Sequence, residues 1–413
     1  LRRSEDTRGE AAQIMFSQMM GKYVRLMTVL SFAEPEILSL SEEKLEAIVN
    51  DPVIADYRHT MEDLLLKKPH TLSADEEKIL AAFGEVIQAP GEIYDSLQDS
   101  DMVFDPAKDS EGNSQEVTGS NFVLLQTSND RELRKNAFLS YYDTYRKHIN
   151  TIAGTYSANV KAAAAEARVR HYESSRAMSM ADEHVPGEVY DNLVASVRDH
   201  FDTMYRYVRL RKRLLGVEEL HFYDVYAPLV KSIERHYTYE EAKEMVLKAV
   251  SPLGHDYVEN VKRGYAQRWI DVYPNKGKSG GAYSSGTYDS NPYIMCNFTG
   301  TLDSVSTIAH EMGHSQHTWL ANTHQPPQYA GYTLFVAEVA STVNENLMIE
   351  QLLETCSDPE ERLSLLNQYM ENFKGTVYRQ TMFAEFELKI NQMQARGEAV
   401  TSDELCRIYG ELN

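Results

Sequence analysis

Glycine and proline, the two residues that most often end a helix, are scarce in this chain. The 413 residues include 21 glycines and 13 prolines, which is about 8% against ~12% in an average protein. Few positions are therefore available to break a helix, and the composition predicts a mainly α protein. A hydrophobic fraction of 42% with 25% charged residues is typical of globular chains and excludes disordered and fibrous classes.

Positive charge is also in short supply. Lys and Arg number 41 against 62 Asp and Glu, which gives a formal net charge of −21. Such a field repels phosphate backbones and anionic lipid headgroups, so we expect neither nucleic acid nor a membrane as a partner. No apolar run approaches the ~18 residues of a spanning helix, and the first residues lack the apolar stretch of a signal peptide.

Cysteine is rare as well. Cys296, Cys356 and Cys406 are odd in number and widely spaced, which excludes a disulfide framework and favours the reducing cytoplasm. The chain starts at Leu1 rather than at an initiator Met, so we expect the translated N-terminus to lie upstream.

The first part of the chain predicts helices followed by a boundary. Residues 11–95 have the pattern of successive helices. The pattern fails in the acidic, turn-rich stretch 98–120. One strand-like run, residues 102–104, lies near its start, and a second, residues 122–125, follows it. We predict a hairpin or linker there, and the best candidate for a domain boundary.

Long helices are expected again after this boundary. One helix is predicted to run from Gly187 to Gly216, and a capping box at Thr238 predicts the start of another. Residues 276–298 are aromatic and punctuated by glycine, which indicates a loop with two strands. Helical character then returns at Leu302 and continues to the end, interrupted around residues 323–331.

The most informative motif is the H-E-x-x-H pentad His310-Glu311-Met312-Gly313-His314. Two histidines four positions apart share one face of a helix, so both imidazoles can bind one metal ion. Glu311, one step further round, can reach a water on that ion rather than the ion itself. Composition alone gives roughly 0.03 such pentads in a chain of this length. The alternative is a pair of surface histidines with a solvated Glu.

A catalytic zinc site needs a third protein ligand and an open fourth position. The candidate is Glu338, whose neighbours in the sequence are valines and alanines. Burying a carboxylate among them is unfavourable unless a cation neutralises it, which favours a ligand role. The alternative is a helix-face Glu paired with Lys or Arg, although this segment has no basic residue nearby in the sequence.

Other polar residues could complete or support the site. His317 competes for the third ligand position, although the ~10 Å rise between positions 310 and 317 makes chelation by a single helix strained; otherwise it lines the site. Thr342 and Glu345 share a helix face with Glu338, so either could hold a ligand imidazole from behind. Both could equally be ordinary helix residues.

At these residues the sequence resembles the oligoendopeptidase F branch of the thimet-type (M3) zinc metallopeptidases. The similar runs are residues 129–131, 280–283, 292–294, 297–303, 306–317, 332–342 and 379–387. The resemblance implies a mainly α, two-lobed protein with a deep substrate channel and a small β-sheet beside a zincin-type H-E-x-x-H helix. It also implies an N-terminal helical lobe at residues 1–110 and a zinc peptidase catalytic region at residues 121–413.

The resemblance assigns His310, His314 and Glu338 to one Zn²⁺ per chain, and Glu311 to acid/base catalysis. It implies an endopeptidase for short unfolded oligopeptides, because only a narrow chain enters the channel. In the family, the segment after the run at Tyr409 leads to His- and Tyr-rich residues that bind the substrate. The chain stops before that segment, so we expect it, and part of the family's N-terminus, to be missing.

In the expected mechanism a metal-activated water attacks the peptide carbonyl, and Glu311 moves the proton. The strands around Ala282, Tyr283 and Tyr293 are candidates to bind the peptide as an added strand, although buried sheet aromatics are an alternative. Tyr329 and Tyr332 are candidates for substrate contact from a loop, and packing is the alternative for both.

Two other functions remain open. One is a different H-E-x-x-H enzyme such as an aminopeptidase, and the other is a catalytically silent peptide-binding scaffold of the same fold. Manganese or cobalt could also occupy nitrogen and oxygen ligands of this kind. The oligomeric state is left open.

Overall fold

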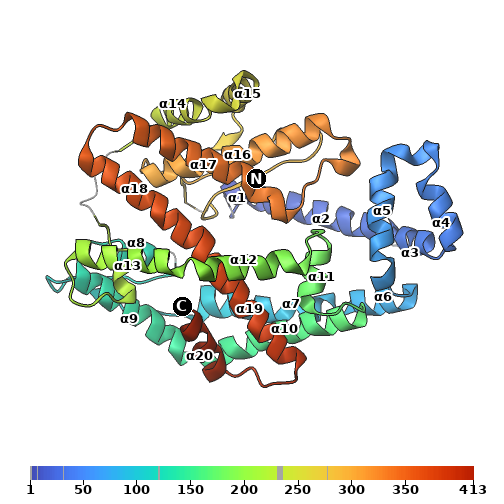
Figure 1. Cartoon of the computed structure of the whole chain (residues 1–413), viewed down its shortest axis with the longest axis horizontal. Helices are drawn as coiled ribbons and strands as arrows, with labels where there is room; N and C mark the ends of the chain where they lie inside the picture. Colours follow the sequence, from blue (N-terminus) through green and yellow to red (C-terminus); the bar gives the residue numbers. More distant parts are fainter. Residues whose placement is uncertain (1, 7, 31, 120, 230–235, 277) are drawn as a thin grey trace. The chain divides into compact units, whose positions relative to one another are not determined.

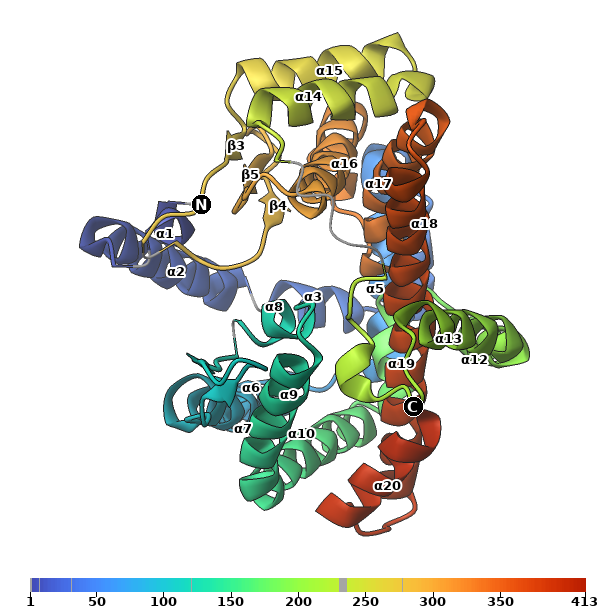
Figure 2. The same cartoon turned by 90° about the vertical axis from the view of Figure 1, so that its left-hand side faces the viewer.

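The computed structural model describes residues 2–6, 8–30, 32–119, 121–229, 236–276 and 278–413. Most of them are helical and the strands are short, which confirms the predicted mainly α fold with small β-sheets (Figures 1 and 2). The chain forms two compact units. Unit 1 comprises residues 1–68 and 233–365, and unit 2 comprises residues 69–232 and 366–413. Within the described residues, no helix has the length and apolar character needed to cross a membrane.

Unit 1 contains the H-E-x-x-H segment. Its helices are α1 (Arg2–Glu5), α2 (Glu10–Leu30), α3 (Ala33–Leu38), α4 (Glu42–Val49), η1 (Pro52–Tyr57), α5 (Arg58–Lys67), α14 (Tyr239–Ala249), η5 (Ser251–Leu253), α15 (His255–Ala266), α16 (Leu302–His324), η6 (Pro327–Tyr329) and α17 (Leu334–Thr355). Its strands are β3 (Ile270–Asp271), β4 (Tyr283–Ser285) and β5 (Tyr293–Met295).

Unit 2 is helical apart from one short hairpin. Its elements are α6 (Ala74–Ala82), α7 (Gly84–Ser96), η3 (Leu97–Asp101), β1 (Ala107–Lys108), β2 (Ser114–Gln115), α8 (Phe122–Gln126), α9 (Arg131–Lys147), α10 (Ile149–Val169), α11 (Ser175–Ala181), α12 (Gly187–Asp199), α13 (Phe201–Leu215), η4 (Phe222–Asp224), η7 (Lys374–Arg379), α19 (Gln380–Ala395) and α20 (Ser402–Leu412). Two helices cross from one unit to the other, η2 (Lys68–His70) and α18 (Pro359–Phe373).

Helix starts follow the capping signals in the sequence. The predicted capping box at Thr238 is present, because its hydroxyl accepts from the Glu241 amide at 3.2 Å while the Glu241 carboxylate accepts from the Thr238 amide at 2.8 Å. Thr301 caps α16 in the same way through Ser304. These reciprocal bonds satisfy amides that have no partner inside the helix, so they fix where each helix begins.

A three-stranded sheet packs beside α16. Its order is β3-β5-β4, with β3 parallel and β4 antiparallel to the central strand β5 (Figure 2). Ile294 of β5 and Val305, Ile308 and Met312 of α16 are fully buried in one core cluster. Burial of this face removes apolar surface from water, which holds α16 against the sheet. The two strands predicted within residues 276–298 are therefore confirmed, whereas β3 was not predicted.

The strand-like runs around the predicted boundary are corrected. The hairpin lies inside the stretch, where β1 pairs with β2, but residues 122–125 belong to helix α8. Phe122 and Gln126 are buried while Val123 and Leu124 are exposed, which is the period of a helix rather than of a strand. Phe122 stacks on Tyr141 of α9 at 4.0 Å between ring centroids. Residues 102–104 form no strand either.

The single helix expected from Gly187 to Gly216 is two helices. Helix α12 ends at Asp199 and α13 begins at Phe201, with His200 between them in a non-helical conformation. The His200 Nδ1 lies 2.7 Å from the Ser196 backbone carbonyl and so caps the end of α12. The division into an N-terminal lobe and a catalytic region at residues 110–121 stays a prediction.

Candidate metal centre

Helices α16 and α17 form the most extensive contact between two described elements, and they lie side by side in both views (Figures 1 and 2). Gly313 makes this contact possible. A Cβ at Gly313 would lie 2.6 Å from the Ala340 carbonyl oxygen and 2.7 Å from the Ser341 Cα. Only a residue without a side chain permits the two backbones to come so close. The ligand candidates of the two helices are therefore brought within reach of one another.

The structure brings His310, His314 and Glu338 together. The two Nε2 atoms lie 3.1 Å apart, and each lies 3.4 Å from Glu338 Oε2. One ligand atom from each of the three residues falls within 4.8 Å of the others, and this is the one such cluster of His, Cys, Asp and Glu among the described residues. A tetrahedral zinc with bonds of 2.0–2.2 Å keeps its ligand atoms about 3.3–3.6 Å apart. The two distances to Glu338 fall in that range, and the distance between the two Nε2 atoms is slightly shorter.

The outer ring nitrogens are held by hydrogen bonds. His310 Nδ1 lies 2.8 Å from Glu345 Oε1, and because an ionised carboxylate only accepts, the ring donates from Nδ1. His314 makes its second bond with the Ala337 backbone. When the His310 ring is neutral, its proton is therefore on Nδ1, and Nε2 is unprotonated with a free lone pair. Lone pairs and a carboxylate facing one another repel unless a cation lies between them, which is the electrostatic requirement of a metal site.

These contacts also set the protonation of the two rings. Burial opposes protonation of His310, but the carboxylates of Glu345, Glu311 and Glu338 together outweigh it and raise the His310 pKa. Burial lowers the pKa of His314, despite the nearby Glu338. His314 is therefore held neutral more readily than His310, and neutrality is the state required of a metal ligand.

Glu338 is not buried among its apolar sequence neighbours, contrary to the expectation from the sequence. Its side chain is 63% exposed rather than buried, and Val339 beside it is also exposed. Because the carboxylate stays in contact with water, it needs no cation to offset a cost of burial. Its position is fixed instead by Ser341, whose hydroxyl donates to Glu338 Oε2 at 2.7 Å. Oε2, the Glu338 oxygen that faces the two rings, is thus oriented by a residue of the same helix, α17.

Glu311 lies on the buried side of α16. It is 6% exposed, and its Oε2 has no hydrogen-bond partner among the residues that the structure describes. Burial raises its pKa to about 6; Glu338 adds to that rise, while His310 and the Ser284 backbone oppose it. A carboxylate with a pKa near neutrality and a free oxygen can both accept and release a proton.

The edge strand β4 lies next to Glu311. Ser284 of β4 holds its hydroxyl 2.8 Å from that of Ser315, which ties the strand to α16. Strand β5 pairs with one side of β4, and no described strand pairs with the other. Ala282 packs against the core cluster, and Tyr283 donates from its hydroxyl to Ser4 at 3.0 Å. An edge strand of this kind can pair with an extended peptide.

The remaining candidates make other contacts. His317 stacks on Tyr332 with 3.7 Å between ring centroids, and its buried Nδ1 has no hydrogen-bond partner within the described part of the chain. It is not part of the three-residue cluster. Thr342 bonds to the Glu338 backbone carbonyl at 2.6 Å instead of to an imidazole. Tyr329 packs near His59 at 5.6 Å between ring centroids, and Tyr293 is 36% exposed on β5.

Three contributors were missed by reasoning from the sequence. Gly313 was seen only as a spacer of the pentad, although the scarcity of glycine in helices was a signal. Ser341 and Ser284 act through the folded structure, since each contacts a residue of the centre from α17 or β4. Nothing in the local sequence of either serine distinguishes it from a surface residue.

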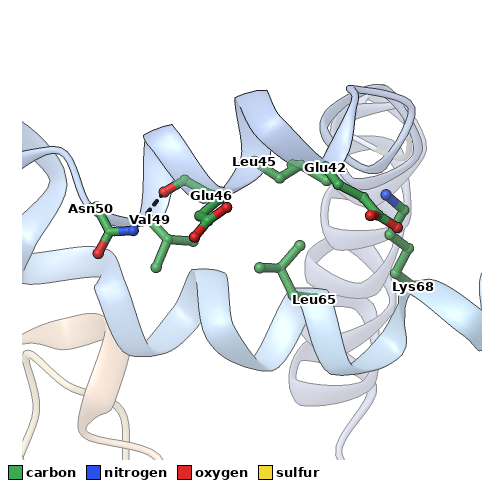
Figure 3. Close-up of a pocket in the computed structure, with 7 residues that line it drawn as sticks. All are labelled: Glu42, Leu45, Glu46, Val49, Asn50, Leu65 and Lys68. Carbon is green, nitrogen blue, oxygen red and sulfur yellow. Dashed lines mark hydrogen bonds between the residues drawn. The ribbon is translucent and has the colours of Figure 1, made fainter.

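A cavity elsewhere in unit 1 takes no part in this centre. It has a volume of about 330 Å³ and opens between α4 and α5 (Figure 3). Its lining residues are Glu42, Leu45, Glu46, Val49, Asn50, Leu65 and Lys68. None of them belongs to the cluster of His310, His314 and Glu338.

Comparison with known proteins identifies the family. The sequence profile of Peptidase family M3 matches residues 124–413, and that of Oligopeptidase F matches residues 36–104. The chain belongs to peptidase family M3. It is 42% identical over its whole length to the oligopeptidase PepF of Bacillus subtilis, and 39% identical to the group B oligopeptidase PepB of Streptococcus agalactiae.

The M3 fold is shared as well. The structure of oligoendopeptidase F from Enterococcus faecium matches all of this chain with a TM-score of 0.74 and 33% identity, over 68% of that protein. The chain spans 62% of the Bacillus subtilis relative and 69% of the Streptococcus agalactiae relative. The predicted resemblance to the oligoendopeptidase F branch is therefore confirmed.

Proposed function

We propose that this M3 family chain carries the centre of a zinc-dependent endopeptidase that hydrolyses internal peptide bonds of short unfolded oligopeptides. The observation that carries the proposal is the convergence of His310, His314 and Glu338 beside the buried Glu311. Membership of a peptidase family supports the reaction class. Two neutral imidazoles and one carboxylate are the donor set of known zinc peptidase sites.

The residues divide the chemistry between them. A divalent cation at this position supplies Lewis-acid polarisation of a carbonyl and makes a water more acidic. Glu311 accepts the proton of the water whose oxygen bonds to the peptide carbonyl carbon. It then delivers that proton to the leaving nitrogen as the C–N bond breaks. Glu345 keeps the His310 ring in place, and Ser341 orients Glu338.

The substrate is proposed to bind mainly through its backbone. The unpaired side of β4 offers main-chain donors and acceptors close to Glu311. Pairing of this kind places little demand on side chains, which supports broad specificity for unfolded peptides. Tyr293, Tyr329, Tyr332 and His317 stay candidates for contact with substrate side chains.

Three further points belong to the proposal. Zinc is the proposed ion, with manganese or cobalt as alternatives for the same ligands. The catalytic region is proposed to span residues 121–413. The three free cysteines favour a reducing compartment such as the cytoplasm.

The test uses a fluorogenic oligopeptide blocked at both ends, with product masses and bound metal measured on the same samples. We expect internal cleavage by the parent chain. Glu311→Gln keeps the metal ligands but has no base, so it should bind zinc and lose at least a hundredfold in rate. The matched control is Glu350→Gln, an exposed position on α17, which should keep the parent rate.

Each alternative has its own result. An aminopeptidase would leave the blocked peptide intact and trim one with a free amino terminus. A silent scaffold would bind zinc and peptide without releasing products. Cleavage by Glu311→Gln at the parent rate would show that the proposed base is wrong.

A further inference from the structure

Unit 2 contains a local excess of positive charge in a chain of net charge −21. Arg211 and Lys374 are almost fully buried, with side chains 3% and 8% exposed, and both pair with the single carboxylate of Glu371. A further cation, Arg379, lies close enough for its charge to disfavour a charged Lys374. Asp224 does not compensate these charges, because its carboxylate pairs with two other arginines.

Arg379 ends the π-helical turn η7 between α18 and α19. Its Nη1 donates to the Tyr226 hydroxyl at 2.6 Å, and its guanidinium lies 5.5 Å from the centre of the Tyr226 ring. The Lys374 ammonium lies 5.3 Å from the same ring. Among the described residues, no carboxylate pairs with Arg379. The guanidinium is half-buried, and its one hydrogen bond to a described residue is the bond to Tyr226, so further donors stay open to a partner outside the protein.

Two further phenols, those of Tyr142 and Tyr409, interact with the Arg379 charge. Burial raises the pKa of Tyr142 and of Tyr409, and the Arg379 charge acts against that rise in both. Tyr409 also packs against Phe386 of α19, with ring centroids 5.5 Å apart. Both phenols stay protonated near neutral pH, so each keeps an O–H donor.

We propose that Arg379 and Tyr226 bind a carboxylate group of an oligopeptide. A guanidinium matches a carboxylate through two parallel hydrogen bonds, and a phenol adds a third donor. The bound anion would relieve the repulsion among Lys374, Arg211 and Arg379, which Glu371 alone cannot neutralise. The identity of the ligand as a peptide rests on the proposed function, whereas the anion site rests on the cation excess alone.

The experiment measures binding by titration calorimetry to the whole chain carrying Glu311→Gln, so that no turnover takes place. Two peptides of the same sequence are compared, one with a free carboxyl terminus and one with a terminal amide. We expect the acid to bind about tenfold more tightly, as a charge-assisted hydrogen bond contributes. Adding Arg379→Gln should abolish the difference, and Arg379→Lys should restore part of it.

Two further variants distinguish binding at this site from a general effect of charge, and melting curves show whether each variant is folded. Arg168→Gln removes the same charge from an exposed position at the end of α10, and it should keep the preference for the acid. Tyr226→Phe keeps the ring but loses the hydroxyl, and it should reduce the preference severalfold. A thermal melt of each variant, followed by circular dichroism, checks that the variant is folded.

A second arm tests free anions through the unfolding midpoint in sodium acetate and sodium chloride. Stabilisation of the parent but not of Arg379→Gln by acetate supports the site. The proposal is overturned if the parent binds the peptide with a free carboxyl terminus and the peptide with a terminal amide equally tightly. If sodium chloride then raises the unfolding midpoint, the site is assigned to inorganic anions instead. Absence of any peptide binding also overturns it. Because no step involves turnover, a failure of the proposed hydrolysis would be seen separately.

Discussion

The backbone of Gly313 in α16 lies directly against the carbonyl of Ala340 in α17, with space for a hydrogen atom and none for a methyl group. This contact sets the distance between the two helices that supply the ligand candidates. His310 and His314 come from one helix and Glu338 from the other. The candidate metal centre therefore depends on a residue that offers no chemical group of its own.

Gly313→Ala should separate α16 from α17 and weaken metal binding. We expect a loss of about 1–3 kcal/mol in the free energy of unfolding, because overpacking forces the backbones apart. The control is Gly154→Ala in α10, where an added Cβ meets nothing within 4 Å. That change should leave stability equal or raise it by about 0.5–1 kcal/mol. Urea unfolding and a zinc competition assay measure both effects, and equal behaviour of the two variants would contradict the packing argument.

Glu345→Gln should weaken zinc binding without removing a ligand. The carboxylate accepts from His310 Nδ1 and raises the electron density on Nε2, and loss of such a partner lowers metal affinity about 10–100-fold. A chelator competition titration gives the affinity. Glu350→Gln on the exposed face of the same helix serves as the control and should keep the parent value. If both variants bind zinc equally, Glu345 has no supporting role.

Glu311→Gln should stabilise the metal-free protein above pH 6. The folded pKa of Glu311 is about 6 against an ordinary value of 4.5, so the unfolded chain ionises first as the pH rises. The free energy of unfolding of the parent therefore falls as the pH rises from 4.5 to 6. Above that range the loss stays constant at about 2 kcal/mol. Below pH 4.5 the carboxyl is protonated in both states and the variant should match the parent.

The measurement is urea unfolding of the chelator-treated protein at several pH values. Glu244→Gln, an exposed position on α14, should show no such pH-dependent difference from the parent. A Glu311→Gln variant that is no more stable than the parent at pH 8 would rule out a raised pKa at this residue.

Asp224→Asn should destabilise unit 2 strongly. The Asp224 carboxylate is fully buried and pairs with Arg131 at 2.8 Å and with Arg134 at 2.9 Å. Although burial opposes it, these arginines lower the Asp224 pKa, so the contribution to stability is present at neutral pH and lost as the pH falls through the folded value. Leaving Arg134 buried without its partner should cost about 3–5 kcal/mol.

Thermal and urea unfolding followed by circular dichroism measure this loss. Asp199→Asn makes the same chemical change at an exposed residue near the end of α12, and it should shift stability by no more than about 0.5 kcal/mol. A similar small effect for both variants would mean that the Asp224 pairs contribute little.

Local signals in the sequence predicted much of the fold. The capping box at Thr238 and the glycine-punctuated strands were read correctly, because capping and turn preferences act over a few residues. The run at residues 122–125 was misread, because four apolar residues fit a strand or a helix equally well. In the folded structure Phe122 of α8 stacks on Tyr141 of α9, and this contact between two helices favours the helical conformation.

By itself the sequence determined the chemistry available to this protein. The spacing of His310 and His314 on one helix fixes two candidate ligands, and it leaves Glu311 beside them, since helical geometry needs no tertiary information. Only the tertiary structure decided where Glu338 lies, which hydrogen bonds orient it, and that Arg379 lacks an acidic partner among the described residues. These depend on contacts between segments far apart in the chain, and no local preference of the backbone encodes them.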